Sequence, residues 1–579
     1  MRNTITNQCK QALSLILRGT GLMDKAQWIR SPYRPQYRQF KKRYGSILGH
    51  NLSKGTGKKK VALICSVHVP EVFIEMELIK ALELAGYIPL VLVKANSQLL
   101  PKYYKLAGVK KIYDWGEFVQ SLNIDEGRDV LDKYSSLEQL LTYEYKGVRV
   151  GRFASCTAVR WNRLGALHLD DTQDREFLAE AIARSMACTR AAESILKRIS
   201  PDLVVMTDKG YSPKGELLDK CLAKGIDVID WALGYKSNTL LLKRFNRENR
   251  DMHTNSLSKK SWNILQQMEW TEDWKEKLQQ EFHQTYARGD WYSVAGTQFN
   301  KRLLEPHEIK SRLGLDPQKK TAFIFSHIFW DAWLFWKGAL FQNYEEWLIE
   351  TVRAACANDQ VNWVIKIHPA NLGKAAREGF SEEPGEQIAI RKHIGTLPPH
   401  VKMIPANSDI CTFSLFDVMD YCLTVRGRVG MEAASRGIPT LTAGTGPYDH
   451  RGFTIDSETR EEYLEKVSRI HEINPLSPFQ EELAQRFAFG FFMLRSLPLS
   501  SVSLEYHKSS KKHLAEGHVN IRTKEDWVSA ADMKAIAQWV GGSDDEDFLL
   551  PIGKKEDGAA FQSLLTSGNG KELFHNKCA

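Results

Sequence analysis

Residues 58–93, KKKVALICSVHVPEVFIEMELIKALELAGYIPLVLV, carry two patterns of apolar residues in turn. Val61–Val67 and Ile88–Val93 are apolar runs of strand length, and residues 71–84 between them repeat apolar side chains at helical spacing. Gly86 stands where this helix is expected to end. A strand, a helix and a second strand in this order form a right-handed βαβ unit, so the sequence predicts a parallel α/β sheet.

The same order of elements recurs along the chain. A second unit spans 201–232, a helix is expected at 175–199, and a new α/β region begins near 318. Further strands are predicted within GVKKIYDW (108–115), KKTAFIFSH (319–327), VNWVIKIHP (361–369), HVKMIPAN (400–407), VMDYCLTV (418–425) and IPTLTAG (438–444). The predicted fold class is therefore α/β, with two Rossmann-like domains that face a cleft.

Composition divides the chain further. We expect a basic N-terminal extension at 1–57, a first α/β domain at 58–310, a second at 311–480, and C-terminal helices with a mobile tail at 481–579. Residues 240–310 within the first domain are more polar and are predicted to be a mostly helical insertion. FAFGFFML at 487–494 suits a buried helix.

The N-terminal extension holds most of the excess positive charge. Fourteen Lys and Arg and one acid, Asp24, give residues 1–60 a charge of +13, so the remainder sums to −4 in a chain of charge +9. An apolar, helix-compatible segment at 5–19 precedes the basic cluster, and this combination fits an anionic membrane surface, with contact expected through residues 1–45. A solvated extension is the alternative. The body of the chain has no basic-aromatic groove pattern, so no nucleic-acid partner is expected.

Nine scattered cysteines without a CxxC pair indicate reduced thiols in a cytoplasmic protein. No apolar run approaches the roughly 20 residues that span a bilayer, and no secretory leader is recognisable at the N-terminus. The expected location is therefore the cytoplasm, with peripheral contact to the inner membrane face.

Polar residues follow the strands of the second half, at the edge where α/β sheets bind ligands. VIKIHPAN at 364–371 ends a buried strand at His368, because Pro369 cannot continue a sheet ladder. Ser326 and His327 end an earlier strand and face the same cleft in this interpretation.

A glycine-containing loop follows the strand that ends at Val425. Its sequence is RGRVG (426–430), and a helix is predicted to begin at Met431–Glu432. Glycines let the backbone approach a ligand, and arginines donate paired hydrogen bonds to phosphate. Glu432 suits a ribose diol, although an acid in a first helical turn is also favoured by the helix dipole alone.

Together these segments resemble a known family. K-x-H-P at 366–369, with G-x-x-G-x-E-A-A-x-x-G-I-P at 427–439, resembles the donor half of GT-B glycosyltransferases. The similarity is strongest to the capsule polysaccharide biosynthesis family, which includes Kdo transferases of capsule assembly. SHIFWDAWLF (326–335), EEWLIETV (345–352) and GPYDHRGFTID (446–456) also resemble segments of such proteins. The resemblance covers about 310–470 well and 59–235 loosely, through Y-x-P-x-G-E at 211–216.

The resemblance implies roles for individual residues. His368 would contact the donor phosphate or leaving group, Glu432 would hold the ribose, and the loop at 427–430 would border the phosphates. Arg428 departs from the pattern, because these families often carry Ser or Thr there. The expected donor-binding residues are Lys366, Arg426, Gly427, Arg428, Gly430, Glu432, Ser326 and His327.

Sugar transfer from a nucleotide-sugar requires stabilisation of the leaving phosphate. Arg426, Arg428, Lys366 and a protonated His368 supply positive charge for this step. No DxD-like pair stands in a suitable context, so we expect a metal-independent reaction without a cofactor, the nucleotide-sugar being a substrate. No G-x-G-x-x-G follows a strand, which argues against a dinucleotide.

An inverting transfer also needs a general base for the acceptor hydroxyl. Strand-end residues of the first half are the candidates: His68 and Asp208 as catalytic groups, and Glu71 beside the acceptor. Each is also explained as a helix cap or a solvated loop residue. Lys209 and Tyr211 are predicted to bind an anionic or saccharide acceptor.

The sequence thus predicts a glycosyltransferase that builds a surface polysaccharide or glycolipid. Three alternatives stay open. A nucleotide-sugar epimerase shares the two-domain design, a phosphotransferase acting on a CDP-alcohol has a similar fold, and a non-catalytic assembly component would keep the fold with a decayed donor site.

Overall fold

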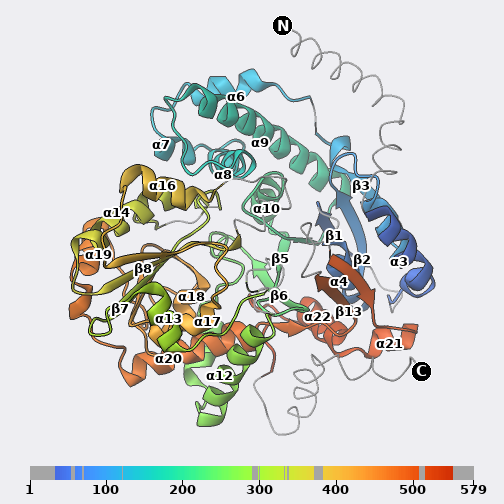
Figure 1. The fold of residues 1–579 in the computed structure, drawn as a ribbon. Helices are drawn as coiled ribbons and strands as arrows, with labels where there is room; N and C mark the ends of the chain where they lie inside the picture. Colours follow the sequence, from blue (N-terminus) through green and yellow to red (C-terminus); the bar gives the residue numbers. More distant parts are fainter. Residues whose placement is uncertain are drawn as a thin grey trace.

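The computed structural model describes residues 33–53, 59–67, 71–119, 121–289, 298, 300–331, 333–335, 338–370, 383–506 and 515–551 (Figure 1). The helix expected at 5–19, the candidate base His68 and the tail after 551 lie outside the described residues.

The first sheet has seven strands in the order β12-β6-β5-β4-β1-β2-β3. Strands β1 to β5 are parallel, and Ile64 in the central strand pairs with Val91 on one side and Val205 on the other. This confirms the βαβ pattern read from residues 58–93 and 201–232. The strands are β1 (Lys60–Ser66), β2 (Tyr87–Val93), β3 (Ile112–Asp114), β4 (Leu203–Met206), β5 (Asp227–Leu233), β6 (Thr239–Phe245) and β12 (Leu497–Pro498).

Helices on both sides of this sheet follow from local signals. The side chain of Asp171 caps α9 by accepting from the N–H groups of Gln173 and Asp174, and Ser200 ends α9 in the left-handed conformation. The expected helices at 71–84 and 175–199 are confirmed. The helices are α4 (Val72–Leu84), α5 (Leu100–Leu106), η1 (Trp115–Glu117), α6 (Ile124–Leu131), α7 (Leu137–Leu141), α8 (Val150–Asn162), α9 (Thr172–Ile199) and α10 (Lys214–Ala223).

The second sheet has five strands in the order β11-β10-β7-β8-β9, all parallel, and lies beside the first (Figure 1). Every strand predicted after residue 318 is present: β7 (Thr321–Phe325), β8 (Asn362–Lys366), β9 (Val401–Ile404), β10 (Tyr421–Thr424) and β11 (Thr440–Thr442). Its helical elements are α14 (Tyr344–Ala357), α16 (Gly385–His393), α17 (Thr412–Leu415), η2 (Phe416–Val418), α18 (Arg428–Ala434), α19 (Arg460–Ser468) and η3 (Ile470–Glu472). The predicted fold class, two α/β units with parallel sheets, is confirmed.

The two units share apolar packing. One cluster of buried residues joins Phe153 of α8 and Ile182 of α9 to Trp347 of α14 and Ile365 of β8. Because this core contains residues of both units, packing does not mark where one unit ends. The domain boundaries at 57, 310 and 480 therefore stay predictions.

The region predicted as a helical insertion begins with a strand instead. Residues 239–245 form β6, which pairs antiparallel with β5. The segment has only seven residues and includes Lys243 and Arg244, so its local pattern is weakly strand-like. Helices follow as expected: α11 (Lys259–Gln267), α12 (Glu272–Ala287) and α13 (Pro306–Leu313).

The C-terminal segment returns to the first sheet. FAFGFFML is buried and helical, as expected, and covers the end of α20 (Pro478–Phe489) and the π-helix η4 (Gly490–Leu494). Strand β12 then pairs with β6, and α22 packs on α4. The predicted helices are therefore joined by strands that the sequence did not reveal. The remaining elements are the hairpin β13 (Val502–Tyr506) and β14 (Ala515–Val519), α21 (Lys524–Ser529) and α22 (Ala531–Gly542).

The described part of the basic extension is also packed on the fold. Helix α3 (Tyr33–Leu48) buries Phe40 and Leu48, and Phe40 contacts the rings of Phe73 and Tyr103. Across the described residues, we find no helix with the length and apolarity needed to cross a membrane.

Buried charges fix the returning segment. The Asp547 carboxylate lies 2.7 Å from Lys243 Nζ on β6 and 3.6 Å from Arg495, and all three side chains are fully buried. Burial alone would raise the pKa of Asp547, but the charges of Arg495 and Lys243 outweigh it and hold that pKa well below its usual range. The ion pairs therefore stabilise the fold above the unfolded-state pKa of about 4, and this contribution is lost as the pH falls below it.

Asp547→Asn is expected to lower the free energy of unfolding by about 3–5 kcal/mol, because it leaves two buried cations without their counter-charge. Urea denaturation at neutral pH measures the change. Asp545→Asn is the matched control, since its pair with Lys260 is exposed and such pairs contribute less than about 1 kcal/mol. Equal losses in the two variants would contradict this account.

Candidate functional site

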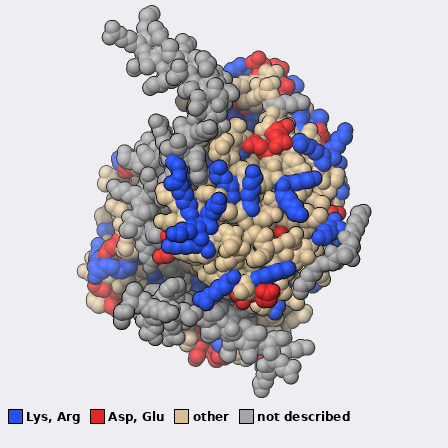
Figure 2. Space-filling model, turned by 90° about the vertical axis from the view of Figure 1, so that its right-hand side faces the viewer, with Lys and Arg blue, Asp and Glu red and all other residues tan. Residues whose placement is uncertain are grey.

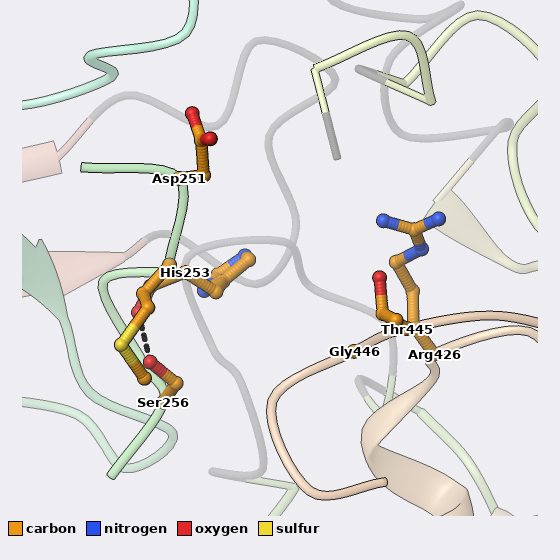
Figure 3. A pocket seen from close by; sticks show the side chains of 7 residues that line it. Asp251, His253, Ser256, Arg426, Thr445 and Gly446 are labelled. Carbon is orange, nitrogen blue, oxygen red and sulfur yellow. Dashed lines mark hydrogen bonds between the residues drawn. The ribbon is translucent and has the colours of Figure 1, made fainter. Parts of the chain in front are cut away.

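A cavity of about 200 Å³ lies between the two units (Figure 3). One wall is the polar loop that follows β6, and the other is formed by the loops after β10 and β11. In Figure 3 the His253 ring and the Arg426 guanidinium point into the space between these walls. The lining residues are Asp251, Met252, His253, Ser256, Arg426, Thr445 and Gly446.

Arg426 is the side chain in this cavity best placed to bind an anion. None of its three guanidinium nitrogens makes a hydrogen bond of ordinary geometry within the described residues, although each is buried. Burial raises the pKa of Tyr344 and the Arg426 guanidinium opposes that rise, so these two side chains interact. The guanidinium carbon lies 5.9 Å from the centre of the Tyr344 ring. A buried cation without hydrogen bonds costs free energy. Arg426 is therefore the candidate anion-binding residue of this cavity.

His327 holds the backbone that carries Arg426. Its Nε2 accepts the N–H groups of Val425 at 3.2 Å and Arg426 at 3.4 Å, and its ring stacks on Tyr344 at 4.5 Å. Burial, with the charges of Arg426 and His368 acting in the same direction, lowers the pKa of His327 to about 3. The neutral ring at pH 7 is therefore an acceptor for the loop through Nε2, and a contact between His327 and a donor phosphate stays a prediction.

His368 and Ser326 meet as the strand-end argument predicted. The backbone N–H of His368 donates to Ser326 Oγ at 3.0 Å, and the His368 Nδ1 accepts the Ala370 N–H at 3.2 Å. The proton of the neutral ring therefore lies on Nε2. His368 also lowers the pKa of His327, which places it close to the Arg426 loop.

Lys366 is buried on β8, and its Nζ has no hydrogen-bond partner within the described part of the chain. Burial lowers its pKa to about 7, and the charge of Lys301 adds to this effect. At neutral pH the amine is therefore only partly protonated.

The expected glycine loop is part of a helix. Helix α18 begins at Arg428, with Gly427 as its N-cap residue, and not at Met431. A Cβ at Gly430 would lie 2.2 Å from the Tyr448 hydroxyl, and one at Gly427 would lie 2.8 Å from Thr424 Oγ1. Both glycines are thus required by packing within the protein.

Glu432 has a partner inside the protein. Its side chain is buried, and Oε2 accepts a hydrogen bond from the Tyr286 hydroxyl of α12 at 2.6 Å. Burial raises the pKa of Glu432 to about 7, although the Tyr286 hydrogen bond and the charges of Arg428 and Arg436 oppose it. A ribose contact by Glu432 stays a prediction, and it would require the Tyr286 bond to open.

The residues expected to bind the acceptor lie where the two units touch. Lys209 is buried, donates to the Arg250 carbonyl at 2.7 Å and lies over the Phe335 ring at 4.6 Å. Burial lowers its pKa. Tyr211 is half-buried, and the Arg160 guanidinium carbon lies 5.9 Å from its ring centre.

Asp208 and Glu71, the two carboxylates predicted to lie near the acceptor, are not brought to the cavity. Asp208 is exposed and has a φ of +57°, and Glu71 stands at the start of α4. Neither lines the cavity.

Asp251 and His253 were missed by the sequence analysis. Arg149 binds Asp219 through two of its nitrogens and reaches Asp251 with the third. The Nδ1 of His253 accepts the Asn255 N–H at 3.0 Å, and burial, with the charges of Arg428 and Lys209, lowers the pKa of His253 to about 3. The neutral ring therefore carries its proton on Nε2. The only local signal was the dense polar stretch NRENRDMHTNS at 246–256.

Within the described residues, no group of three or more His, Cys, Asp or Glu side chains is placed to hold a metal ion. The expectation of a metal-independent reaction stays a prediction.

No family model matches this chain, and no curated protein matches it. Solved structures give distant matches. A beta Kdo 2,4 transferase, KpsC of Thermosulfurimonas dismutans, is 13% identical over 49% of this chain and 78% of its own, with a TM-score of 0.30. The UDP-GlcNAc 2-epimerase of Neisseria meningitidis is 12% identical over 74% of this chain and 97% of its own, with a TM-score of 0.25. Another UDP-N-acetylglucosamine 2-epimerase is 12% identical over 86% of this chain and 100% of its own, with a TM-score of 0.28. TM-scores this low carry no argument about family or activity.

His327→Phe is expected to keep the stacking on Tyr344 and to lose the acceptor for two backbone N–H groups. We expect a loss of about 1–3 kcal/mol in unfolding free energy at pH 7, measured by urea denaturation. The folded-state pKa of about 3 lies below the ordinary value of 6.5, so the His327 contribution is complete above pH 6.5 and declines as the pH falls toward 3. The variant should therefore lose less stability than the wild type over that range.

His307→Phe on α13 is the control, because this histidine is exposed. If it destabilises the protein as much as His327→Phe does at pH 7, the hydrogen bonds to His327 have no special role in stability.

Proposed function

We propose that the protein is a glycosyltransferase that moves a sugar from a nucleotide-sugar to a surface polysaccharide or glycolipid acceptor. The observation that carries the proposal is the Arg426 guanidinium, which makes no hydrogen bond of ordinary geometry within the described residues and lies in a cavity between two α/β units. The K-x-H-P and G-x-x-G-x-E resemblance supports the same assignment.

The cavity suits the phosphate groups of the donor. Arg426 can donate two parallel hydrogen bonds to a phosphate, and the Nε2–H of neutral His253 adds a donor from the opposite wall (Figure 3). A volume of about 200 Å³ is below the range of roughly 300–1,000 Å³ that encloses larger ligands. We therefore assign the cavity to the phosphates, with the sugar and base extending beyond it.

In this proposal, the protein's cations stabilise the leaving phosphate as the glycosidic bond breaks. Arg426 faces the phosphate directly, while Arg428, whose charge reaches His253, and His368, whose charge reaches His327, add positive charge nearby. Lys366 is outside the cavity lining and its charged neighbour is Lys301, so its part in this step is a proposal from the K-x-H-P resemblance alone.

The acceptor would enter from the side of Lys209 and Tyr211, and a carboxylate of the first unit would take its proton. Asp208 is the exposed candidate. Asp251 lines the cavity, but its bond to Arg149 favours the ionised carboxylate and makes it a weaker base.

A nucleotide-sugar epimerase is the second candidate. An anion site between the two units serves such an enzyme equally well, because a one-substrate reaction needs no acceptor site. An epimerase would convert the nucleotide-sugar without an added acceptor, whereas a transferase would release nucleotide only when an acceptor is present.

The donor site is tested by binding of CMP, CDP, UDP and GDP to the purified protein, measured by calorimetry. One nucleotide should bind, and Arg426→Ala should weaken it roughly 10- to 100-fold, as expected for a charge-assisted hydrogen bond pair. Arg353→Ala is the control, since Arg353 is exposed on α14 and, among the described residues, pairs with Glu350 of its own helix.

If no nucleotide binds to the folded wild type, the donor site is wrong and a non-catalytic assembly role is favoured. If nucleotide binds equally to Arg426→Ala, the phosphate lies elsewhere.

A further inference from the structure

A basic surface covers the face of the first unit that carries α3. Figure 2 shows this side of the molecule, on which Lys and Arg side chains spread over a broad area with few acidic residues among them. Neither α3 nor the neighbouring α5 contributes to the cavity between the units. The surface is therefore a separate feature from the donor site.

Two segments that lie far apart in the sequence form this surface. Residues 33–48 and 100–111 together hold nine Lys and Arg and no acid. They lie side by side, because α3 packs on α5, Gly45 faces Leu106, and Gly108 faces the Gly49 carbonyl. We call residues 33–48 and 100–111 the basic face. Its exposed cations are Arg38, Lys41, Lys42, Arg43, Lys105, Lys110 and Lys111.

Packing holds the basic side of α3 outward. Phe40 is buried against Phe73 and Tyr103, and Tyr37 lies edge-on to Tyr103 at 5.0 Å. With the apolar side of the helix fixed inward, the cations project away from the sheet. Helix α3 is thus a rigid platform for charge and not a free tail.

Three neighbouring cations of this face have no counter-charge among the described residues. Arg43 pairs with Glu516 at 3.6 Å, but Arg38, Lys41 and Lys42 have no ion pair with any described residue. Three exposed cations within five positions repel one another unless an anionic partner binds them.

We propose that the basic face binds the headgroups of an anionic lipid bilayer. A broad basic area with few acidic residues suits a planar anionic surface, where each Lys or Arg strengthens binding about fivefold. Nucleic acid fits less well, because single-strand binding uses exposed aromatic rings and the rings of Tyr37 and Phe40 face the protein interior. The lysines at 102–111 extend the contact beyond the residues 1–45 expected from the sequence.

The test is co-sedimentation of the full chain with vesicles of phosphatidylcholine, with and without phosphatidylglycerol. We expect binding only to the anionic vesicles, and weakening as salt rises above roughly 0.15 M. Arg38→Glu, Lys41→Glu and Lys42→Glu combined should reduce the affinity at least about 100-fold. A second triple variant, Lys105→Glu, Lys110→Glu and Lys111→Glu, should act in the same direction, because α5 belongs to the same face.

The control has the same charge change elsewhere: Lys259→Glu, Lys310→Glu and Lys392→Glu, all exposed on other elements. It should bind vesicles nearly as the wild type does. Circular dichroism checks that each variant is folded.

Three results would overturn the proposal. The first is equal binding to neutral vesicles, the second is equal weakening by the control variant, and the third is anionic vesicle binding that survives both triple variants. A parallel titration with a short RNA completes the test, since tighter binding to RNA than to vesicles at the same salt would replace lipid as the partner.

Discussion

The cost of burying ionisable groups between two sheets governs this structure. Parallel strands end in polar loops, and where two such sheets meet, those loops lose water. His253 and His327 are neutral there at pH 7. Lys366 and Glu432 each have a pKa of about 7, and Glu432 accepts a hydrogen bond from Tyr286. Each of these groups lowers its cost by giving up charge or by finding a partner. Arg426 keeps its charge, because a guanidinium stays protonated, and it makes no hydrogen bond of ordinary geometry within the described residues. We therefore propose it as the residue that binds an anionic ligand.

Most of the fold could be predicted because its strands are short apolar runs with clear ends. β1, β2, β7, β8 and β10 are all of this kind, and two of the longer helices, α9 and α14, begin at the capping side chains Asp171 and Asn343. β6 and β12 could not be predicted, since what stabilises them is distant in sequence. In the sequence, Lys243 interrupts the apolar run of β6, and its partner Asp547 is far away along the chain. β12 has only two residues, and its partner strand lies more than two hundred residues earlier.

The site was partly predictable for the same reason. Strand ends identify one edge of each sheet, so Ser326, His327, His368 and Arg426 were found by position alone. What each side chain does there depends on tertiary contacts. His327 looked like a donor ligand and instead supports the loop, and Asp251 and His253 lie on a loop after a strand that was itself missed.

The glycines at 427 and 430 show how a motif can mislead. In the sequence they suggest a backbone opened for a phosphate, but the structure uses them to seat α18 against Thr424 and Tyr448. The Tyr448 hydroxyl donates to the Gly427 carbonyl at 2.5 Å. Gly430 leaves room for the Tyr448 hydroxyl, which in turn holds Gly427 in place. This packing would be needed whether or not a ligand binds, and the glycine pattern alone is therefore weak evidence for a phosphate site. The argument for a phosphate site rests on the neighbouring Arg426. His327 and Tyr448 hold the backbone on either side of it, and its guanidinium makes no hydrogen bond of ordinary geometry within the part of the chain that the structure describes.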